Sequence, residues 1–150
     1  MLNFFCKSFD ELSKKELHDS FLLRSEVFVV EQNCVYQDVD GKDPYALHVL
    51  GKNKQNKVIA YARILPKGHA YSSFVAIGRV VISQEYRGKR LGHYLVQFSI
   101  EQATKKHKES LIKISAQSHL IPFYNSHGFQ ADGKEYLEDG IPHTAMILST

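Results

Sequence analysis

The residues with the clearest chemical potential form a basic, glycine-containing turn at positions 87–92. It follows an apolar run at 80–82 and precedes residues with helical spacing. Glycine lets the backbone approach a ligand closely, and the first N–H groups of a helix have no partner within it. Together with the helix dipole and the side chains of Arg87, Lys89 and Arg90, these N–H groups predict an anion site suited to a diphosphate. An ordinary solvated helix start has the same pattern, so both interpretations stay open.

Two common phosphate loops and a metal centre are excluded by their motifs. The chain contains no Gly-x-x-x-x-Gly-Lys-Ser/Thr sequence and no Gly-x-Gly-x-x-Gly sequence. Its eight histidines form no His-x-x-x-His or Cys/His ligand set, so no metal is predicted. The formal net charge is only +3 and the basic cluster is small, so no nucleic-acid partner is predicted.

The elements that must position this turn alternate between strands and helices. An N-cap at Asp10 or Ser13 predicts the first helix. Gly78, within a β-branched run, predicts a bulge or a close backbone approach. The order predicts an α/β sheet with helices on its faces. The expected elements are strands at 2–7, 46–52, 58–65, 74–82, 111–116, 128–134 and 144–148, a loop at 33–45, and helices beginning after the N-cap, at 87–91 and at 119–127.

Composition indicates one domain over residues 1–150. Hydrophobic residues make up 43% and charged residues 23% of the chain, which is typical of a globular domain with its own core. The two cysteines lack a Cys-x-x-Cys spacing and predict free thiols in a reducing compartment. No segment has the length of a membrane span or the pattern of a signal peptide. The protein is therefore expected in the cytoplasm, away from the membrane.

Two motifs carry a family resemblance. Residues 87–92 resemble the acetyl-CoA pyrophosphate loop of the GNAT N-acetyltransferases, Arg/Gln-x-x-Gly/Ala-x-Gly/Ala, with Arg90 at the first Gly/Ala position. Residues 117–129 resemble a second motif of that family, with Gln117 in place of its Asn, Tyr124 at its tyrosine, and Gly128-Phe129 at its end. Segments 23–32, 36–40, 60–63, 77–80 and 138–143 are similar to the ElaA-like group of this superfamily.

The resemblance implies the GNAT acyl-CoA N-acyltransferase fold, a mixed central sheet with an antiparallel meander and a parallel pair, flanked by helices. It implies direct transfer of an acetyl group from acetyl-CoA to a primary amine. Tyr124 is the implied proton donor, because a phenol of pKa ~10 stays protonated at neutral pH; a buried core tyrosine is the alternative. The implied cofactor-binding residues are Val80, Val81, Ile82, Arg87, Gly88, Lys89, Arg90, Leu91, Gly92 and Gln117.

The sequence does not decide which group takes the proton of the amine. Water is one alternative, and the candidate side chains are Glu26, Glu31, His48, His119, Glu138, Asp139 and His143.

Charged residues elsewhere also have two interpretations. The acids Glu31, Asp38 and Asp40 either attract a cationic amine or belong to a solvated loop. Arginines within apolar stretches are costly unless paired. Ion pairs with those acids are therefore predicted, and an acceptor carboxylate is the alternative for one of them. The arginines concerned are Arg24, Arg63 and Arg79.

The acceptor is expected to be a small-molecule amine, with polyamines, amino acids, aminoglycoside-like molecules and protein amines all open. The protein is expected to be a monomer or a homodimer. The alternative function is a catalytically silent module that binds acyl-CoA on the same fold, because a fold by itself does not fix an activity.

Overall fold

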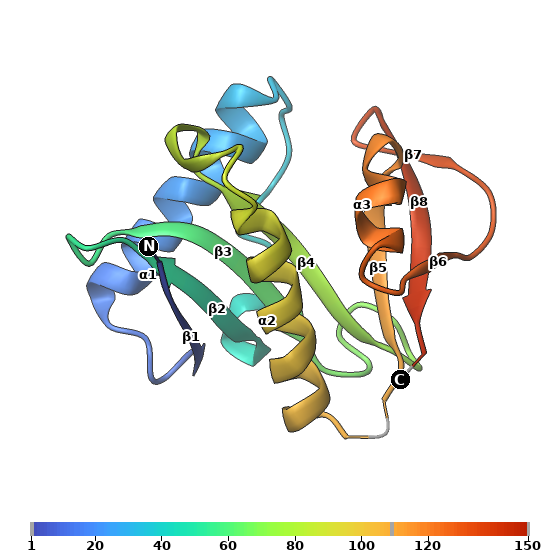
Figure 1. Ribbon diagram of the computed structural model, residues 1–150, viewed down its shortest axis with the longest axis horizontal. Coiled ribbons are helices and arrows are strands. Elements are labelled where there is room, and N and C mark those ends of the chain that lie inside the picture. The colour runs from blue at the N-terminus through green and yellow to red at the C-terminus, as the bar shows by residue number, and fades with distance from the viewer. Residues whose placement is uncertain (1, 109, 150) are drawn as a thin grey trace.

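One mixed, eight-stranded sheet forms the centre of the computed structural model, which describes residues 2–108 and 110–149 (Figure 1). The strand order is β1-β2-β3-β4-β5-β8-β6, and β7 pairs with β8. β4 and β5 are parallel, whereas the other neighbours are antiparallel, so the predicted meander with a parallel pair is confirmed. The strands are β1 (Asn3–Ser8), β2 (Leu47–Lys52), β3 (Val58–Leu65), β4 (Val75–Ile82), β5 (Ile112–Gln117), β6 (Gln130–Ala131), β7 (Tyr136–Glu138) and β8 (Ile141–Leu148).

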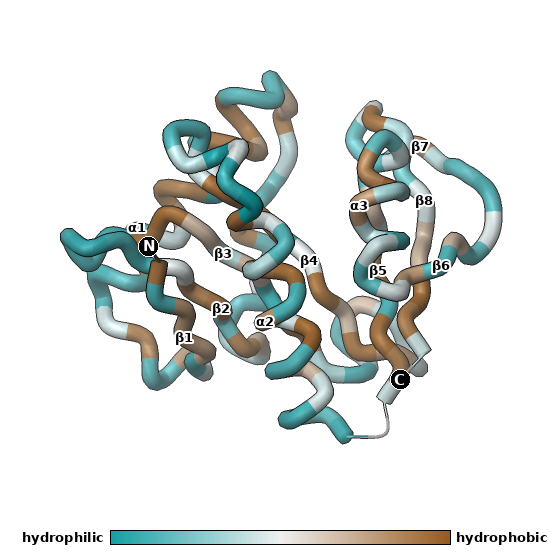
Figure 2. Tube along the Cα trace, in the orientation of Figure 1, coloured by the Kyte–Doolittle hydropathy of each residue, from teal (hydrophilic) through white to brown (hydrophobic). Residues whose placement is uncertain are grey.

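Helices cover both faces of the sheet. α1 lies behind β2 to β4 in Figure 1, and α2 and α3 lie in front. Hydrophobic residues follow the strands and the loops are hydrophilic, as Figure 2 shows. On the α2 side, Leu95, Val96 and Ala103 pack against the sheet, and on the α1 side Leu23 and Val27 do so. The helical segments are α1 (Lys14–Arg24), a π-helical continuation (Ser25–Glu31), α2 (Leu91–Lys106), α3 (Ile121–Asn125) and short 3-10 turns at Asp43–Tyr45, Gln84–Tyr86 and Ser118–Leu120.

The start of α1 is capped and also tied to the sheet. Ser13 Oγ accepts a hydrogen bond from the Glu16 backbone at 3.0 Å, and the Ser13 N–H donates to the Glu16 carboxylate at 2.8 Å. This capping box satisfies two helix-end N–H groups, and Ser13 rather than Asp10 is the N-cap. The other Glu16 oxygen accepts from Lys7 of β1 at 2.8 Å and from Lys52 of β2 at 2.6 Å. One buried carboxylate thus joins α1 to two strands.

Glu16→Gln should weaken the acid sensitivity of the fold. Burial alone would raise the pKa of Glu16, but hydrogen bonds from Lys52 and Lys7 outweigh it and lower the pKa to about 2. A carboxyl in the unfolded chain has a pKa of ~4.3, so ionised Glu16 stabilises the fold fully above about pH 5 and loses this contribution as the pH falls to about 2. Urea unfolding across this range should show a shallower decline for Glu16→Gln. The exposed Glu85→Gln is the control, and equal declines in the two variants would contradict the prediction.

The parallel pair is short, and the two strands separate beyond it. β4 and β5 are paired only at Val75–Ile112 and Ala76–Lys113. Further along β4, a bulge interrupts its register with β3 at Tyr61 to Arg63. Gly78 was predicted to mark a bulge or a close backbone approach. A bulge does occur beside it, between the pairs Tyr61–Val81 and Arg63–Gly78, and the residue with positive φ (51°) in this bulge is Arg79. The backbone edge of β4 beyond Ala76 therefore faces an opening rather than a neighbouring strand.

The structure differs from the expected elements in several places. The second helix begins only at Leu91, the last residue of the predicted start at 87–91, because Gly88 (φ 83°) and Arg90 (φ 60°) adopt left-handed conformations that a helix excludes. The strand predicted at 128–134 is reduced to the two residues of β6. The short helix predicted at 119–127 is a 3-10 turn followed by the five residues of α3. Strand β7 was not predicted at all. Its signal is Asp139-Gly140, a two-residue turn with positive φ at both positions that joins β7 to β8.

Candidate active site

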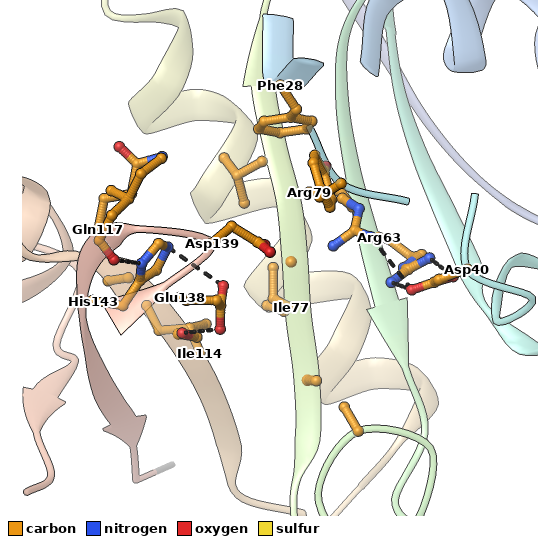
Figure 3. A pocket seen from close by; sticks show the side chains of 18 of the residues that line it. Phe28, Asp40, Arg63, Ile77, Arg79, Ile114, Gln117, Glu138, Asp139 and His143 are labelled. Carbon is orange, nitrogen blue, oxygen red and sulfur yellow. Dashed lines mark hydrogen bonds and ion pairs between the residues drawn. The ribbon is translucent and has the colours of Figure 1, made fainter. Parts of the chain in front are cut away.

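A cavity of about 440 Å³ lies where β4 and β5 separate. Figure 3 shows its side chains in two groups on either side of β4: Phe28, Arg79, Arg63 and Asp40 on one side, and Gln117, His143, Glu138 and Asp139 on the other. Tyr124 of α3 also lines the cavity. The volume is ordinary for a small-molecule site. Segments from both ends of the chain thus meet around one space.

The first wall rests on a closed ring of three arginines and three aspartates. The arginines come from α1, β3 and the β4 bulge, and the aspartates come from the loop before β2. Each side chain of the ring contacts two side chains of opposite charge. The ring is formally neutral because it contains three positive and three negative groups. Its ion pairs are Arg24 with Asp38 (2.9 Å) and Asp43 (2.8 Å), Arg63 with Asp43 (3.2 Å) and Asp40 (2.8 Å), and Arg79 with Asp40 (3.3 Å) and Asp38 (2.8 Å).

The ring confirms the prediction that these arginines pair with acids of the neighbouring loop. Asp43 completes it and was missed, although it lies in the same polar stretch as Asp38 and Asp40. Glu31 lies outside the ring and pairs with Arg87 instead. Burial alone would raise the pKa of Asp40, but hydrogen bonds from Arg63 and the Lys42 backbone hold it well below its usual range. The loop is therefore fixed as one wall of the cavity.

The second wall carries an acid and a histidine from the β7–β8 hairpin. His143 is 7% exposed, and its Nδ1 bonds to the Ile141 carbonyl at 2.7 Å. A carbonyl only accepts, so Nδ1 carries the hydrogen and the lone pair of the neutral ring is on Nε2. Nε2 lies 3.4 Å from Glu138 Oε2. Ser115 Oγ donates to the other Glu138 oxygen at 3.1 Å and also bonds to the Tyr136 hydroxyl.

Tyr124 is held by aromatic neighbours, and its hydroxyl has no hydrogen-bond partner among residues 2–108 and 110–149. Its ring contacts Phe123 and Phe129 edge-on, at centroid distances of 5.0 and 5.9 Å. The side chain is 8% exposed and lines the cavity. Burial raises its pKa to about 12, so the phenol keeps its proton at neutral pH.

The basic turn before α2 presents a row of free backbone donors. No acceptor in the described part of the chain faces the N–H groups of residues 88–92. The left-handed residues Gly88 and Arg90 alternate with others in this turn, which suits an anion-binding concavity. An added Cβ at Gly88 would meet nothing within 4 Å, so this backbone is open to a ligand. The turn fits a diphosphate.

The structure places the remaining predicted cofactor residues on two strands, with Val80, Val81 and Ile82 on β4 and Gln117 at the end of β5. Val80 and Gln117 line the cavity. Val81 packs into the core beside α1, and Ile82 packs toward α2, so any contact they make with a ligand comes from the backbone. Arg87 donates to the Ile82 carbonyl at 3.1 Å and forms a two-pronged pair with Glu31 at 2.6 and 3.0 Å. This pair joins the basic turn to the π-helical segment and was not predicted.

Of the seven candidates for the proton acceptor, three line the cavity: Glu138, Asp139 and His143. His48 is 1% exposed, and both its ring nitrogens are bonded, to Tyr61 at 2.6 Å and the Asp43 carbonyl at 2.9 Å. Glu31 is paired with Arg87. The other two, Glu26 and His119, do not line the cavity.

Neither a metal-binding cluster nor a membrane-spanning helix is found among the described residues. Residues 2–108 and 110–149 contain no cluster of three or more His, Cys, Asp or Glu side chains placed to hold a metal ion. None of the helices in that part of the chain combines the length and apolarity needed to span a membrane.

A mixed sheet that opens between its parallel strands, beside a turn of free N–H groups, defines the acyl-CoA N-acyltransferase fold. A crystal structure of an acyl-CoA N-acyltransferase from Pseudomonas aeruginosa matches this chain with a TM-score of 0.94 and 39% identity, covering 99% of this chain and 100% of that one. The model of the acetyltransferase (GNAT) domain matches residues 10–150. The chain therefore belongs to the GNAT acetyltransferase family.

Within that family the chain is ElaA-like. It is 43% identical to protein ElaA of Escherichia coli over 138 residues, which cover 91% of this chain and 89% of ElaA. The crystal structure of Escherichia coli ElaA matches with a TM-score of 0.93 and 38% identity, covering 99% of this chain and 100% of that one. The resemblance and the fold predicted from the sequence are both confirmed, and the protein is an acyltransferase by fold and family.

Proposed function

We propose that the protein is an acetyl-CoA-dependent N-acetyltransferase that acts on a primary amine by direct transfer. One observation carries this proposal: a single cavity is lined by Tyr124, whose hydroxyl has no partner among the described residues, by β4 beyond its pairing with β5, and by the His143–Glu138 pair. A proton donor and a proton acceptor thus share a space next to an edge that can hold an extended ligand. The cavity of about 440 Å³ must receive both reacting groups, which favours a short acyl chain.

Acetyl-CoA is the proposed donor substrate, and its diphosphate fits the N–H groups of residues 88–92 with Arg87 and Lys89 beside them. The edge of β4 between Val80 and Ile82 offers backbone groups for the pantetheine amides, as a neighbouring strand would, except for the Ile82 carbonyl, which already accepts from Arg87 at 3.1 Å. An N–H group on the same edge can polarise the thioester oxygen, because a fixed donor there needs no reorganisation during the reaction.

The proton steps follow from the two walls. Acetyl-CoA supplies a thioester carbon that a neutral amine attacks. His143 Nε2 accepts the proton that the amine loses, and Glu138 stabilises the resulting imidazolium at 3.4 Å. Ser115 and Tyr136 hold the Glu138 carboxylate in place. Tyr124 donates its proton to the departing sulfur and later regains one from solvent.

Calorimetric titration with acetyl-CoA, followed by turnover with a panel of amines, tests this proposal. Selective binding over NADH and ATP, weakened in Arg87→Ala and Lys89→Ala, together with formation of acetylated amine, is the expected result. Because Cys34 has a partly exposed thiol, CoA should be measured by chromatography rather than by a thiol reagent. Binding without turnover across the panel would indicate the alternative, a silent acyl-CoA-binding module. Absence of binding by folded protein would overturn both.

Glu31→Gln should strengthen acetyl-CoA binding by about two- to fivefold, the range of an exposed ion pair worth up to ~1 kcal/mol. Arg87 and Glu31 are 40% and 34% exposed, and Arg87 must release this carboxylate before it can pair with a diphosphate. Glu26→Gln is the matched control, because it removes the same charge from the same π-helical segment without touching Arg87. Equal affinities for the two variants in calorimetry would contradict competition at Arg87.

A small amine as the acceptor, a cytoplasmic location, a monomeric or dimeric state and the lack of a nucleic-acid or membrane partner stay predictions from the sequence. Size-exclusion chromatography with light scattering and a duplex-binding assay would test the assembly and nucleic-acid predictions directly.

A further inference from the structure

The two walls of the cavity differ in the sign of the groups that they offer to a ligand. On one side, the hairpin contributes the carboxylates of Glu138 and Asp139 beside the ring of His143 (Figure 3). On the other side, the loop and β4 contribute Arg79, Arg63, Lys42 and the Asp40 carboxylate. Asp40 is already paired with both arginines, so Lys42 leaves this wall with a net positive charge. An acceptor that carried only an amine would leave Arg79 and Lys42 without a partner on the ligand.

Arg79 has a donor that the ring leaves unused. Its Nε donates to Asp38 Oδ1 at 2.8 Å, and its Nη2 donates to the Asp38 carbonyl at 3.0 Å and to Asp40 at 3.3 Å. Nη1 has no acceptor in residues 2–108 or 110–149, and the side chain is 21% exposed and lines the cavity. Arg63, in contrast, is 5% exposed and gives both terminal nitrogens to aspartates.

The geometry of Arg79 is fixed before any ligand arrives. Its backbone has a positive φ of 51° in the β4 bulge, and its guanidinium lies 5.4 Å from the centre of the Tyr36 ring. Tyr36 in turn donates to Asp38 at 2.7 Å. A preorganised donor binds without losing side-chain freedom. Lys42 adds a second cation to the same wall, and its ammonium has no ion-pair partner in the described part of the chain.

The opposite wall is suited to an ammonium group. The carboxylates of Glu138 and Asp139 line this side of the cavity, and Glu138 Oε2 lies 3.4 Å from His143 Nε2. An ammonium group can donate to these carboxylate oxygens. His143 is also paired with Gln117 in the register of β5 and β8, which places it at the proposed donor end of the cavity.

We propose that the acceptor is a small zwitterionic molecule, such as an amino acid, whose carboxylate binds Arg79 and Lys42 and whose amine faces His143 and Glu138. This inference rests on the proposed function, because it names the class of amine that the same site acetylates. Arg79 and Lys42 then determine specificity, whereas His143 and Tyr124 act on protons. Charge-assisted hydrogen bonds to the carboxylate and to the amine then hold the acceptor in one orientation in the cavity.

Matched pairs of amines that differ only in the carboxylate test the proposal: L-phenylalanine and phenylethylamine, L-tyrosine and tyramine, L-lysine and cadaverine, and γ-aminobutyrate and propylamine. At saturating acetyl-CoA, kcat/KM should be at least about tenfold higher for the carboxylated member of the best pair, as expected for one charge-assisted hydrogen bond. A preference for the amine without a carboxylate would overturn the inference and leave the proposed N-acetyltransferase function standing.

Variants of Arg79 and Lys42 test whether these two residues cause the preference for a carboxylated acceptor. Arg79→Lys and Lys42→Gln should each raise KM for the carboxylated acceptor about tenfold, with kcat changed much less, because they bind the carboxylate and do not move protons. KM for its decarboxylated partner should change less than about twofold. Lys67→Gln, an exposed lysine away from the cavity, is the control for loss of charge. An equal rise in KM for both members of a pair would overturn the assignment.

A measurement of acceptor binding tests the inference independently of turnover. With CoA present, the unfolding midpoint should rise with the carboxylated member of a pair and not with the other. Such selective stabilisation without acetylation of any amine would support the zwitterion site while overturning the proposed activity. No stabilisation by any carboxylated amine, together with no acetylation, would overturn the inference as well.

Discussion

Replacing Tyr124 by phenylalanine should lower kcat for acetyl transfer by about 10²–10⁴-fold, the usual contribution of a positioned general acid. The substitution removes only a hydroxyl that has no hydrogen-bond partner in the described residues, so no polar group is left unsatisfied. The aromatic contacts with Phe123 and Phe129 stay in place. Acetyl-CoA affinity and the unfolding midpoint should therefore be close to those of the unmodified protein. Steady-state kinetics, calorimetry and thermal unfolding measure the three quantities.

Tyr94→Phe is the control for this substitution. Tyr94 is 59% exposed on α2, so its hydroxyl reaches solvent and its loss should change neither kcat nor acetyl-CoA affinity. Burial raises the pKa of Tyr124 to about 12, and activity should thus show no loss from this group as the pH rises to 10. Full turnover by folded Tyr124→Phe would remove the tyrosine as proton donor and leave the fold assignment intact.

Arg24→Met should destabilise the protein by about 3–5 kcal/mol, the range found when one partner of a buried ion pair is removed. Arg24 has no exposed surface, and its nitrogens bond to the Asp38 carboxylate, the Asp38 carbonyl and the Asp43 carboxylate. Methionine fills a similar volume but leaves two buried aspartates with one arginine partner each. Urea unfolding gives the loss of free energy directly.

Lys15→Met on the same helix provides the comparison. Lys15 pairs with Asp19 at 2.7 Å, but its side chain is 65% exposed, so the loss should stay below about 0.5 kcal/mol. Acceptor binding should also weaken in Arg24→Met, because the ring holds the loop that forms one wall of the cavity. A loss for Arg24→Met as small as that for Lys15→Met would show that the ring does not stabilise the fold.

The sequence by itself predicted the features that depend on neighbours along the chain. An N-cap at Asp10 or Ser13, the strands at 46–52 and 58–65 and the helix after the basic turn follow from capping residues and from the spacing of apolar residues, which act within a few residues. The free N–H groups before α2 follow from the same local geometry. The need to pair three arginines in apolar stretches was also evident, because an unpaired buried charge is costly wherever it lies.

Only the tertiary structure decided which groups meet. Arg24 and Arg79 reach the same Asp38 from 14 and 41 residues away, through the packing of α1 and the bulge that turns β4. Three of the seven candidate bases line the cavity, and their positions depend on β7, a strand of three residues that pairs with β8. Short-range propensities do not encode such distances. The distances are fixed by strand register and by the separation of β4 from β5. The same separation forms the cavity. Beyond Ala76, β4 and β5 are no longer paired, so side chains from both parts of the sheet line one space there.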